Sequence, residues 1–497
     1  MMGSVVDRRR FLKFLSSVPL AFAACAGAGV RVPPASPGGS TPGVRGGSSG
    51  VERVIRIDGA NAARSALLTA RDADRPVAIA AGRHASGGQQ VLTGGWLLDM
   101  RDHGHVRDFD PDRRTVTVDA GMQWPELLDF LAATRDPGGA GLTIAQKQVG
   151  ADRISIGGTL SANAHGCALS RPPFVEDVER FTLMDADGRE ESVDRGRNRN
   201  LFRLAVGGYG LFGIVTDVTL RLVERLKVER VASEERSAVL ARILDDRARA
   251  GHLYGQALLA TDPADASFLA AGILTTYQPV PATTPIPPDQ RILAPADRRE
   301  LRLLAHRDPA EATRALVRHL LATSGQIHWA DDLQRSAHQD GQHEAVDREL
   351  GRGVEGSERK AQLNVPPERL EEFLASAREH LRAGVAPVVE ASVRVVEPDL
   401  ESFLPWARER YACVTFDLHV DHTPAGLAEA RETGRRLIDA ALEQGGTFYL
   451  TYDRPSTRAQ VEAAYPRFPE FLRLKRVIDP AERFQSDWYR HCRELFA

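Results

Sequence analysis

The sequence predicts an α+β fold with two domains. Short strand-like and helix-like stretches follow one another from Val51, and the pattern changes near residue 228. The chain has 497 residues, of which 42% are hydrophobic and 26% charged, as in an ordinary globular protein with a large core. The first part does not repeat as regular βαβ units, so we expect a mixed sheet there.

Residues 1–25 are typical of an export signal, with a basic stretch, a short apolar run and then small residues. Residues 7–13 resemble the twin-arginine consensus with Asp7 in place of Ser or Thr, and a general secretory signal is the alternative. Simple cleavage near Ala23 and lipidation of Cys25 both stay open. Residues 26–50 are expected to form a disordered Gly/Pro/Ser tether. We therefore expect an exported bacterial protein, in the periplasm or cell envelope, whose only route to a membrane would be a lipid on Cys25.

Charge and cysteine usage exclude several classes of function. The net charge of -3 gives no general attraction to nucleic acid. Cys167, Cys413 and Cys492 are spaced too widely to indicate a disulfide framework or a zinc site, so no metal is expected. Lysine is rare, which shortens the list of possible catalytic amines. The lysines are Lys13, Lys147, Lys227, Lys360 and Lys475.

The first domain is expected over residues 51–228. Alternation at period two predicts strands, and apolar residues at helical spacing predict helices. Asp187-Gly188 predicts the turn of a hairpin over 181–193. The expected strands are 51–58, 75–82, 114–121 and a long strand 214–231, and the expected helices are 61–73 and 123–134.

The second domain is expected over residues 229–470. A sheet with helices on one face fits its pattern. Residues 471–497 are expected to return to the first domain. The expected strands are 360–365, 388–396, 413–420 and 447–452, and the expected helices are about 309–323, 367–383 and 424–444.

The segment GYGLFG, residues 208–213, matches the pattern G-x-G-x-x-G. A Rossmann nucleotide site requires a helix directly after this motif. Residues 214–222 alternate as a strand instead, so we reject the Rossmann interpretation.

Three glycine-rich segments, 81–90, 155–166 and 207–222, each adjoin strand-like text. Such segments converge where backbone N–H groups must surround an anion or a flat ring. In this order, together with VTVDAGMQWPELL and the hairpin, they resemble the vanillyl-alcohol-oxidase family, also called p-cresol-methylhydroxylase (PCMH)-type flavoproteins, over residues 51–228. The resemblance implies a two-subdomain FAD-binding PCMH-type domain, followed by a substrate (cap) domain of antiparallel sheet with helices.

The same resemblance implies FAD as the cofactor. Residues 82–89 would wrap its pyrophosphate, the second segment would line the flavin, and Ile214 would contact the cofactor through its backbone. The implied cofactor-binding residues are Gly82, Arg83, His84, Ala85, Ser86, Gly87, Gly88, Gln89, Gly121, Gly157, Gly158, Asn163, His165, Gly166 and Ile214.

His84 raises the question of covalent attachment. In family members with GHSxxGQ, the histidine at this place is bonded to the flavin. This chain keeps His84 and the Gly88-Gln89 pair, but it has Arg83 before the histidine and Ala85 after it. A covalent bond through His84 and a dissociable FAD beside it both stay open.

Residues 445–490 resemble the flavoprotein of decaprenylphosphoryl-ribose epimerisation and the sugar-alcohol and aldonolactone oxidases. The epimerisation enzyme has a lysine three residues after the tyrosine of this segment. Here Tyr449 is kept, but Tyr452 replaces the lysine and cannot carry its positive charge. This difference puts a phosphorylated lipid-sugar substrate in doubt.

Further catalytic candidates lie on the expected cap strands. Alternation puts Asp417 and His419 on one face with Cys413 and Thr415, and His419 is a plausible base near neutral pH, with a structural histidine as the alternative. Gln362 matches a site glutamine of the epimerisation family. Glu390 and Arg394 would also face the flavin, and Arg394 would bind a substrate carboxylate or pair with a core acid. His419 and His422 fall on opposite faces, which argues against a metal site. The candidate catalytic residues are Tyr452, Tyr449, His419, Gln362 and Arg394.

These features predict an exported FAD-dependent oxidoreductase that oxidises a hydroxylated small molecule, a polyol, sugar or lactone, by hydride transfer to flavin N5. Its electron acceptor would be oxygen or another carrier. Two alternatives stay open: amine oxidation like that of cytokinin dehydrogenase, and a flavin-binding protein without turnover.

Overall fold

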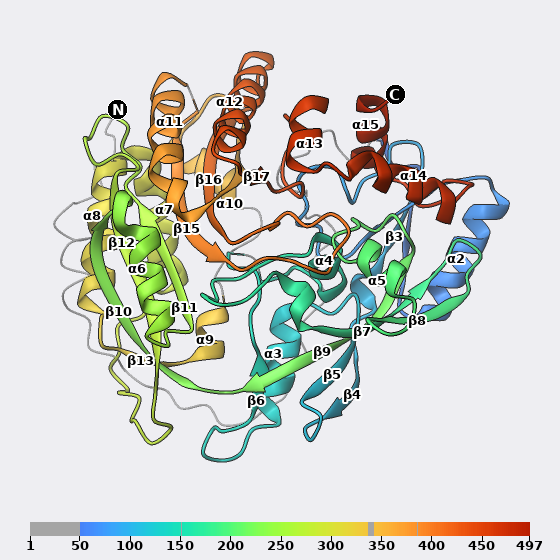
Figure 1. Cartoon of the computed structure of the whole chain (residues 1–497), viewed down its shortest axis with the longest axis horizontal. Helices are drawn as coiled ribbons and strands as arrows, with labels where there is room; N and C mark the ends of the chain where they lie inside the picture. Colours follow the sequence, from blue (N-terminus) through green and yellow to red (C-terminus); the bar gives the residue numbers. More distant parts are fainter. Residues whose placement is uncertain (1–49, 151, 336–341, 385) are drawn as a thin grey trace.

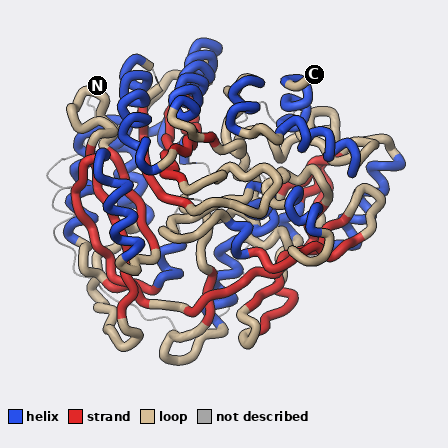
Figure 2. Tube along the Cα trace, in the orientation of Figure 1, coloured by secondary structure: helices blue, strands red, loops and turns tan. Residues whose placement is uncertain are grey.

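The computed structural model describes residues 50–150, 152–335, 342–384 and 386–497. The expected signal and nearly all of the tether lie outside the described residues, as does Cys25. Within the described part, no helix is long and apolar enough to cross a membrane. Figure 1 shows the first domain and the cap side by side, and Figure 2 shows loops crossing the middle between them.

The chain begins with a small parallel sheet in the order β1-β3-β2. Helix α2 (Ala60–Asp72) packs on it because Ala63, Ala66, Leu67 and Ala70 form one apolar stripe at helical spacing. The strands are β1 (Arg53–Arg56), β2 (Val77–Ala80) and β3 (Trp96–Asp99), and the 3-10 helix η2 (Met100–Asp102) follows.

A second sheet of the first domain is antiparallel, in the order β4-β5-β9-β7-β8, with β6 paired to β9. The expectation of one mixed sheet is therefore wrong: parallel and antiparallel pairs are segregated into separate sheets. The expected hairpin is present as β7 and β8, and Gly188 takes the left-handed conformation at φ 78°. The elements are β4 (Val106–Asp110), β5 (Thr115–Asp119), α3 (Trp124–Ala133), β6 (Leu142–Ile144), α4 (Ile156–Ala162), η3 (Phe174–Asp177), β7 (Val178–Met184), β8 (Glu190–Asp194), α5 (Arg199–Ala205) and β9 (Ile214–Glu224).

The long strand expected over 214–231 is two strands in two different sheets. β9 ends at Glu224, and β10 (Lys227–Arg236) starts the cap. The break falls where Arg225 turns inward: its Nε donates to Asp331 at 2.8 Å, and its guanidinium lies 3.9 Å from the Trp329 ring centroid. Period-two alternation continues through the break, so the pattern alone does not reveal it.

The cap is an eight-stranded antiparallel sheet in the order β13-β10-β12-β11-β15-β16-β14-β17. The strand expected over 447–452 ends after β17 (Thr447–Phe448), and the chain then leaves the sheet. The other strands are β11 (Tyr254–Leu259), β12 (Ala271–Val280), β13 (Ile327–Trp329), β14 (Gly356–Val365), β15 (Val388–Val396) and β16 (Tyr411–Asp421). The helices are α6 (Ser237–Arg249), α7 (Pro295–Arg307), α8 (Pro309–Ala322), α9 (Ala330–Gln334), α10 (Gln342–Leu350), η4 (Pro367–Arg369), α11 (Leu370–Ala383) and α12 (Pro424–Glu443).

Helices cover both faces of the cap sheet, whereas one face was expected. Phe416 of β16 packs against Phe373 of α11, with ring centroids 6.5 Å apart. The next residue, Asp417, points to the opposite face and lies 3.7 Å from Arg302 of α7. The expected helix 309–323, α8, packs against α7 in this second layer, and helical spacing does not reveal which face of a sheet a helix covers.

The C-terminal segment returns to the first domain through α13 (Arg458–Ala464), α14 (Phe468–Ile478) and α15 (Asp487–Leu495). Val77 of β2 donates its backbone N–H to Arg483 at 2.7 Å and accepts one from Gln485 at 2.9 Å. Residues 483–485 therefore run beside β2 and form an isolated parallel bridge at Val77.

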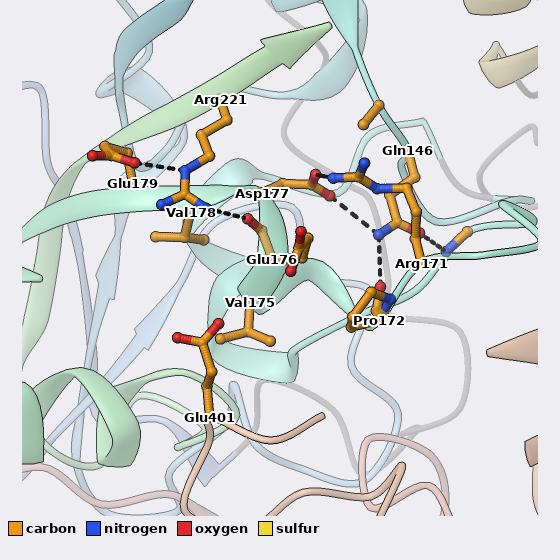
Figure 3. Close-up of polar contacts among 12 residues, drawn as sticks. Gln146, Arg171, Pro172, Val175, Glu176, Asp177, Val178, Glu179, Arg221 and Glu401 are labelled. Atoms are coloured by element: carbon orange, nitrogen blue, oxygen red, sulfur yellow. Dashed lines mark hydrogen bonds and ion pairs between the residues drawn. The ribbon is translucent and has the colours of Figure 1, made fainter. Parts of the chain in front are cut away.

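A buried polar network fixes the loop that follows the second glycine-rich segment (Figure 3). Asp177 accepts a hydrogen bond from Gln146 at 3.1 Å and pairs with Arg171, while burial raises its pKa to about 6. Gln146 also accepts the backbone N–H of Gly166 at 3.3 Å. The network thus holds the chain at residues 165–166 in one position.

Candidate functional site

A cavity lies between the three glycine-rich segments and the cap. The first segment and the end of β2 contribute residues 79–85, the second segment and the residue before it contribute Ile154–Ser155 and Gly157–Gly158, and the third contributes Tyr209, Gly210 and Gly213. Thr451 and Tyr452 line it from the cap side. No Asp or Glu is among the described residues that line this cavity, so an anionic group would meet no opposing carboxylate.

The first segment is a loop whose shape depends on close backbone approach. A Cβ at Gly82 would overlap the carbonyl oxygen of Arg153 and lie 2.9 Å from Ile154 Cα. Gln90 closes the loop by donating its side-chain amide to Ala85 O at 2.7 Å. Gln89 donates to Leu450 O at 2.8 Å and so joins the loop to the segment that follows β17.

Arg83 stands where the resembling family has glycine. The backbone conformation of Arg83 explains why glycine is favoured at this position. Its φ is 57°, in the left-handed region that glycine adopts without cost. Its guanidinium donates at 2.9 Å to Asp99, which is fully buried. The ion pair offsets the conformational cost, so this departure leaves the loop in a shape suited to the cavity.

The second and third segments are bonded to each other. Gly207 N donates to Leu160 O at 3.0 Å, and Tyr209 N donates to Ser161 O at 3.0 Å. At Gly157, a Cβ would lie 2.8 Å from Ala120 Cβ. The three segments that were expected to converge therefore form one wall without bulky side chains at its centre.

This wall fits FAD. Glycines at positions 82, 157, 158, 210 and 213 leave room for a flat ring and a diphosphate to approach the backbone. The Oε1 atom of Gln89, on the lining, is buried and has no hydrogen-bond partner among the described residues. FAD offers several donors for such an acceptor.

About half of the residues implied by the family resemblance line the cavity: Gly82, Arg83, His84, Ala85, Gln89, Gly157 and Gly158. Ser86 faces a different pocket, and a Cβ at Gly121 would overlap backbone oxygens of Met100 and His103. Ile214 is fully buried between the lining residues Gly213 and Val215. The others that do not line it are Gly87, Gly88, Asn163, His165 and Gly166.

Asn163 has a structural position instead. It ends α4 in the left-handed conformation, its amide donates to Asp399 at 2.8 Å, and its side-chain oxygen accepts Val175 N at 2.9 Å. His165 links the first domain to the cap, because its Nε2 lies 3.1 Å from Gln362 Oε1 on β14. Burial and then Arg394 lower the pKa of His165 to about 4, so its ring is neutral.

Beyond the lining residues Thr451 and Tyr452, side chains on three neighbouring strands share one face of the cap sheet. Register pairs Lys360 with Asp417, Gln362 with Thr415, and Glu390 with Asp417, so these residues share one face. Lys360 Nζ donates to Asp417 at 2.5 Å. Burial alone would lower the pKa of Lys360, but Asp417, Tyr452 and Glu390 together raise it. Lys360 is therefore a cation held beside Tyr452.

The two predicted tyrosines have different places. Tyr452 lines the cavity, and burial raises its pKa while Lys360 opposes that rise. Tyr449 lies behind it, with ring centroids 5.4 Å apart, and its hydroxyl donates to Ala162 O at 2.8 Å. Arg394 donates to Gln256 at 3.2 Å.

His419 does not line the cavity. Its ring packs edge-on against His306 of α7 at 5.1 Å, and it is 2% exposed. It shares the expected face of β16 but lies beyond Asp417, under α7. In the described part of the chain, no group of three or more His, Cys, Asp and Glu side chains is arranged to hold a metal ion.

Lys360 is the residue that the sequence reasoning missed. The epimerisation enzyme's lysine is replaced here by Tyr452, and another lysine was sought on the same strand. Lys360 instead places a positive charge on the neighbouring strand β14. A signal was available, because Lys360 lies two residues before Gln362 and alternation places both on one face. Thr451, Tyr209 and Gln148 on the lining were missed as well.

Known proteins show related sequences and a related fold. Residues 51–194 match the FAD binding domain family. The mitochondrial L-galactono-1,4-lactone dehydrogenase 2 of Oryza sativa subsp. japonica is 35% identical over 120 residues, which are 24% of this chain and only 19% of that protein. Decaprenylphosphoryl-beta-D-ribose oxidase of Mycolicibacterium smegmatis is 24% identical over 453 residues, 87% of this chain and 92% of that protein.

A solved structure shares the fold across both domains. Crystalline 6-hydroxy-D-nicotine oxidase from Arthrobacter nicotinovorans superposes with a TM-score of 0.59 at 18% identity. The superposition covers 88% of this chain and 91% of the other.

Proposed function

We propose that this chain, a member of the PCMH-type FAD-binding proteins by its residues 51–194, oxidises a hydroxyl-bearing small molecule, namely a polyol, a sugar or a lactone. One observation carries the proposal: a glycine-lined cavity is closed on the cap side by Tyr452, with the Lys360–Asp417 ion pair behind it. The names of the relatives, a lactone dehydrogenase and a ribose-derivative oxidase, support this substrate class.

FAD, when bound, supplies a ring that accepts the hydride of a substrate C–H bond. Tyr452 presents a phenol to the cavity from the cap side, so its Oη would accept a hydrogen bond from the substrate hydroxyl. In its phenolate form it would take the hydroxyl proton and become a neutral phenol, and the Lys360 ammonium stabilises the phenolate before that transfer. Asp417 keeps Lys360 charged and in place, so Lys360 and Asp417 are positioning residues that act through Tyr452.

Anaerobic bleaching of the bound flavin tests the reaction class. Purified holoprotein is mixed with a panel of polyols, sugars, lactones and amines, and the loss of flavin absorbance is followed. Bleaching by a hydroxylated compound or lactone supports the proposal. Bleaching by amines alone would favour the cytokinin-dehydrogenase-like alternative, and no bleaching by any compound would favour a flavin-binding protein without turnover. Admission of oxygen afterwards identifies an oxidase by rapid return of the colour.

The attachment of FAD is tested separately. We propose that His84, which lies on the cavity wall, is the attachment residue if the cofactor is covalent. Mass spectrometry of the denatured peptide containing His84 measures this directly. An added flavin mass establishes the bond, and its absence identifies a dissociable FAD.

We propose that the protein is exported to the periplasm or cell envelope. The proposal rests only on the twin-arginine-like motif at residues 7–13. Fractionation of cells that express the full chain and an Arg8→Lys, Arg9→Lys variant tests it. Retention of the variant in the cytoplasm supports twin-arginine export, and unchanged secretion contradicts it.

A further inference from the structure

A second pocket of about 960 Å³ lies beside the loop of residues 81–93, which contains the first glycine-rich segment and is called the FAD loop below. The pocket is surrounded by Ser86 and Thr93 of the FAD loop, by α12, by the segment Asp453–Thr457 and by α15. It is separate from the flavin cavity, since none of its lining residues lines that cavity.

The pocket carries a surplus of positive charge. Five arginines line it against three carboxylates, which are Asp453, Asp487 and Glu494. Asp453 is already paired with Arg359 at 2.5 Å. Asp487 accepts both the backbone N–H and the hydroxyl of Thr93 at 2.9 Å. With histidines neutral, the five arginines and three carboxylates give the lining a net charge of +2.

Three of the arginines are held by neutral oxygens rather than by carboxylates. Arg435 donates to Pro455 O at 2.7 Å, Arg454 to Asp487 O at 2.9 Å, and Arg490 to Thr93 O at 2.6 Å. Each contact fixes the side chain and leaves its charge available to a ligand. Arg431, on the exposed side of the pocket, has no ion-pair partner among the described residues.

The pKa of His491 is lowered in part by the pocket's arginines. Burial lowers its pKa most, Arg454 lowers it further, Glu494 opposes this effect, and Arg431 lowers the pKa again. Its Nε2 atom is buried and meets no hydrogen-bond partner in the described part of the chain. A donor or acceptor group on a ligand would satisfy this atom.

The floor of the pocket is the outer side of the FAD loop. Gly88 faces Arg454, with a built Cβ 3.5 Å from the guanidinium carbon. Gly88 O accepts Trp488 N at 3.2 Å, and Val91 O accepts Asp487 N at 2.8 Å. A ligand that bridges the arginines would therefore brace this loop from outside.

We propose that this pocket binds a phosphorylated small molecule through its arginine cluster. Several converging guanidinium groups suit the geometry and charge of a phosphate better than a single carboxylate does. Occupancy braces the loop whose inner side forms part of the flavin cavity. This proposal does not depend on which substrate the flavin oxidises.

Calorimetric titration of the FAD-loaded full chain with inorganic pyrophosphate at low salt tests the site. We expect saturable binding with a Kd below about 1 mM that weakens as salt rises. Arg431→Glu should weaken it about fivefold or more, because the reversed charge loses no internal contact and opposes the anion. The matched control is Arg436→Glu, on the same helix but outside the pocket, where the side chain pairs with Glu432.

The other outcomes separate the explanations. Equal weakening by Arg431→Glu and Arg436→Glu would overturn the site, since general surface charge would then explain binding. Release of FAD by pyrophosphate would place the anion in the flavin cavity and overturn it as well. A citrate titration as tight as that of pyrophosphate would overturn the preference for phosphate. Absence of any saturable heat at millimolar pyrophosphate would overturn the whole proposal.

Discussion

The two walls of the flavin cavity are built in different ways. The wall of the first domain depends on close backbone approach at glycines 82, 157, 158, 210 and 213, with side chains such as His84 and Tyr209 beside them. The cap side consists of side chains, with Tyr452 in front of Lys360 and Asp417. A backbone wall accommodates one shape and tolerates no added atom, whereas a side-chain wall can change its chemistry one residue at a time. We therefore expect substitutions at the glycines of the first-domain wall to abolish FAD binding. Substitutions of side chains on the cap side should alter only the rate of the reaction.

The largest effect is expected from Gly82→Ala. The new Cβ would overlap Arg153 O, so the loop must move and the FAD content of the purified protein should fall about tenfold or more. The flavin-to-protein absorbance ratio measures this. Gly138→Ala is the control, because a Cβ there meets no atom within 4 Å. Full FAD content in a folded Gly82→Ala protein would contradict the comparison.

A smaller effect is expected from Lys360→Met. FAD content should stay normal, while the rate of flavin reduction by substrate falls roughly 100-fold. Because Lys360 acts through Tyr452, the double variant with Tyr452→Phe should be no slower than Tyr452→Phe alone. Lys360→Arg should recover part of the rate. Stopped-flow spectroscopy measures all four proteins, and multiplicative losses in the double variant would show that Lys360 acts independently.

Asp417→Asn should move a pH profile rather than abolish activity. Asp417 opposes the effect of burial on Lys360, so its loss lowers the pKa of that ammonium. A lysine that must be charged then loses its proton at lower pH, and the alkaline limb of the flavin-reduction rate shifts to lower pH. An alkaline limb at the wild-type position would remove Asp417 from the mechanism.

The smallest effect is expected from His419→Gln. This side chain lies under α7 beside His306, away from the cavity, so the rate of flavin reduction should change less than about twofold. The thermal midpoint is expected to drop, since a buried ring is replaced. A loss of rate comparable with that of Lys360→Met would restore His419 as a candidate base.

The same contrast explains what could be predicted from the sequence. The glycine segments are local patterns that the family resemblance depends on, and about half of the residues it implied line the cavity. The cap wall depends on which residue of β14 lies opposite which residue of β16. The pairing of Lys360 with Asp417 joins positions 57 residues apart, and periodicity within one strand does not reveal it.

The errors have related causes. His419 was placed on the correct face, but its position along β16 puts it opposite Glu358 and beneath α7. The break at Arg225 was missed because apolar residues recur at period two on both sides of it, while the buried pair with Asp331 is a contact across 106 residues. The family resemblance implied that Asn163 lines the flavin, and in the structure its amide donates to Asp399.

The return of the C-terminal segment to β2 has a consequence for biosynthesis. Arg483 and Gln485 bond to Val77, and Trp488 bonds to Gly88 of the FAD loop, so residues 483–488 complete a structure that begins at Val77. On a ribosome, the loop that surrounds the cofactor site therefore stays unfinished until residues 483–488 have emerged. We expect stable loading of FAD only after that point in synthesis.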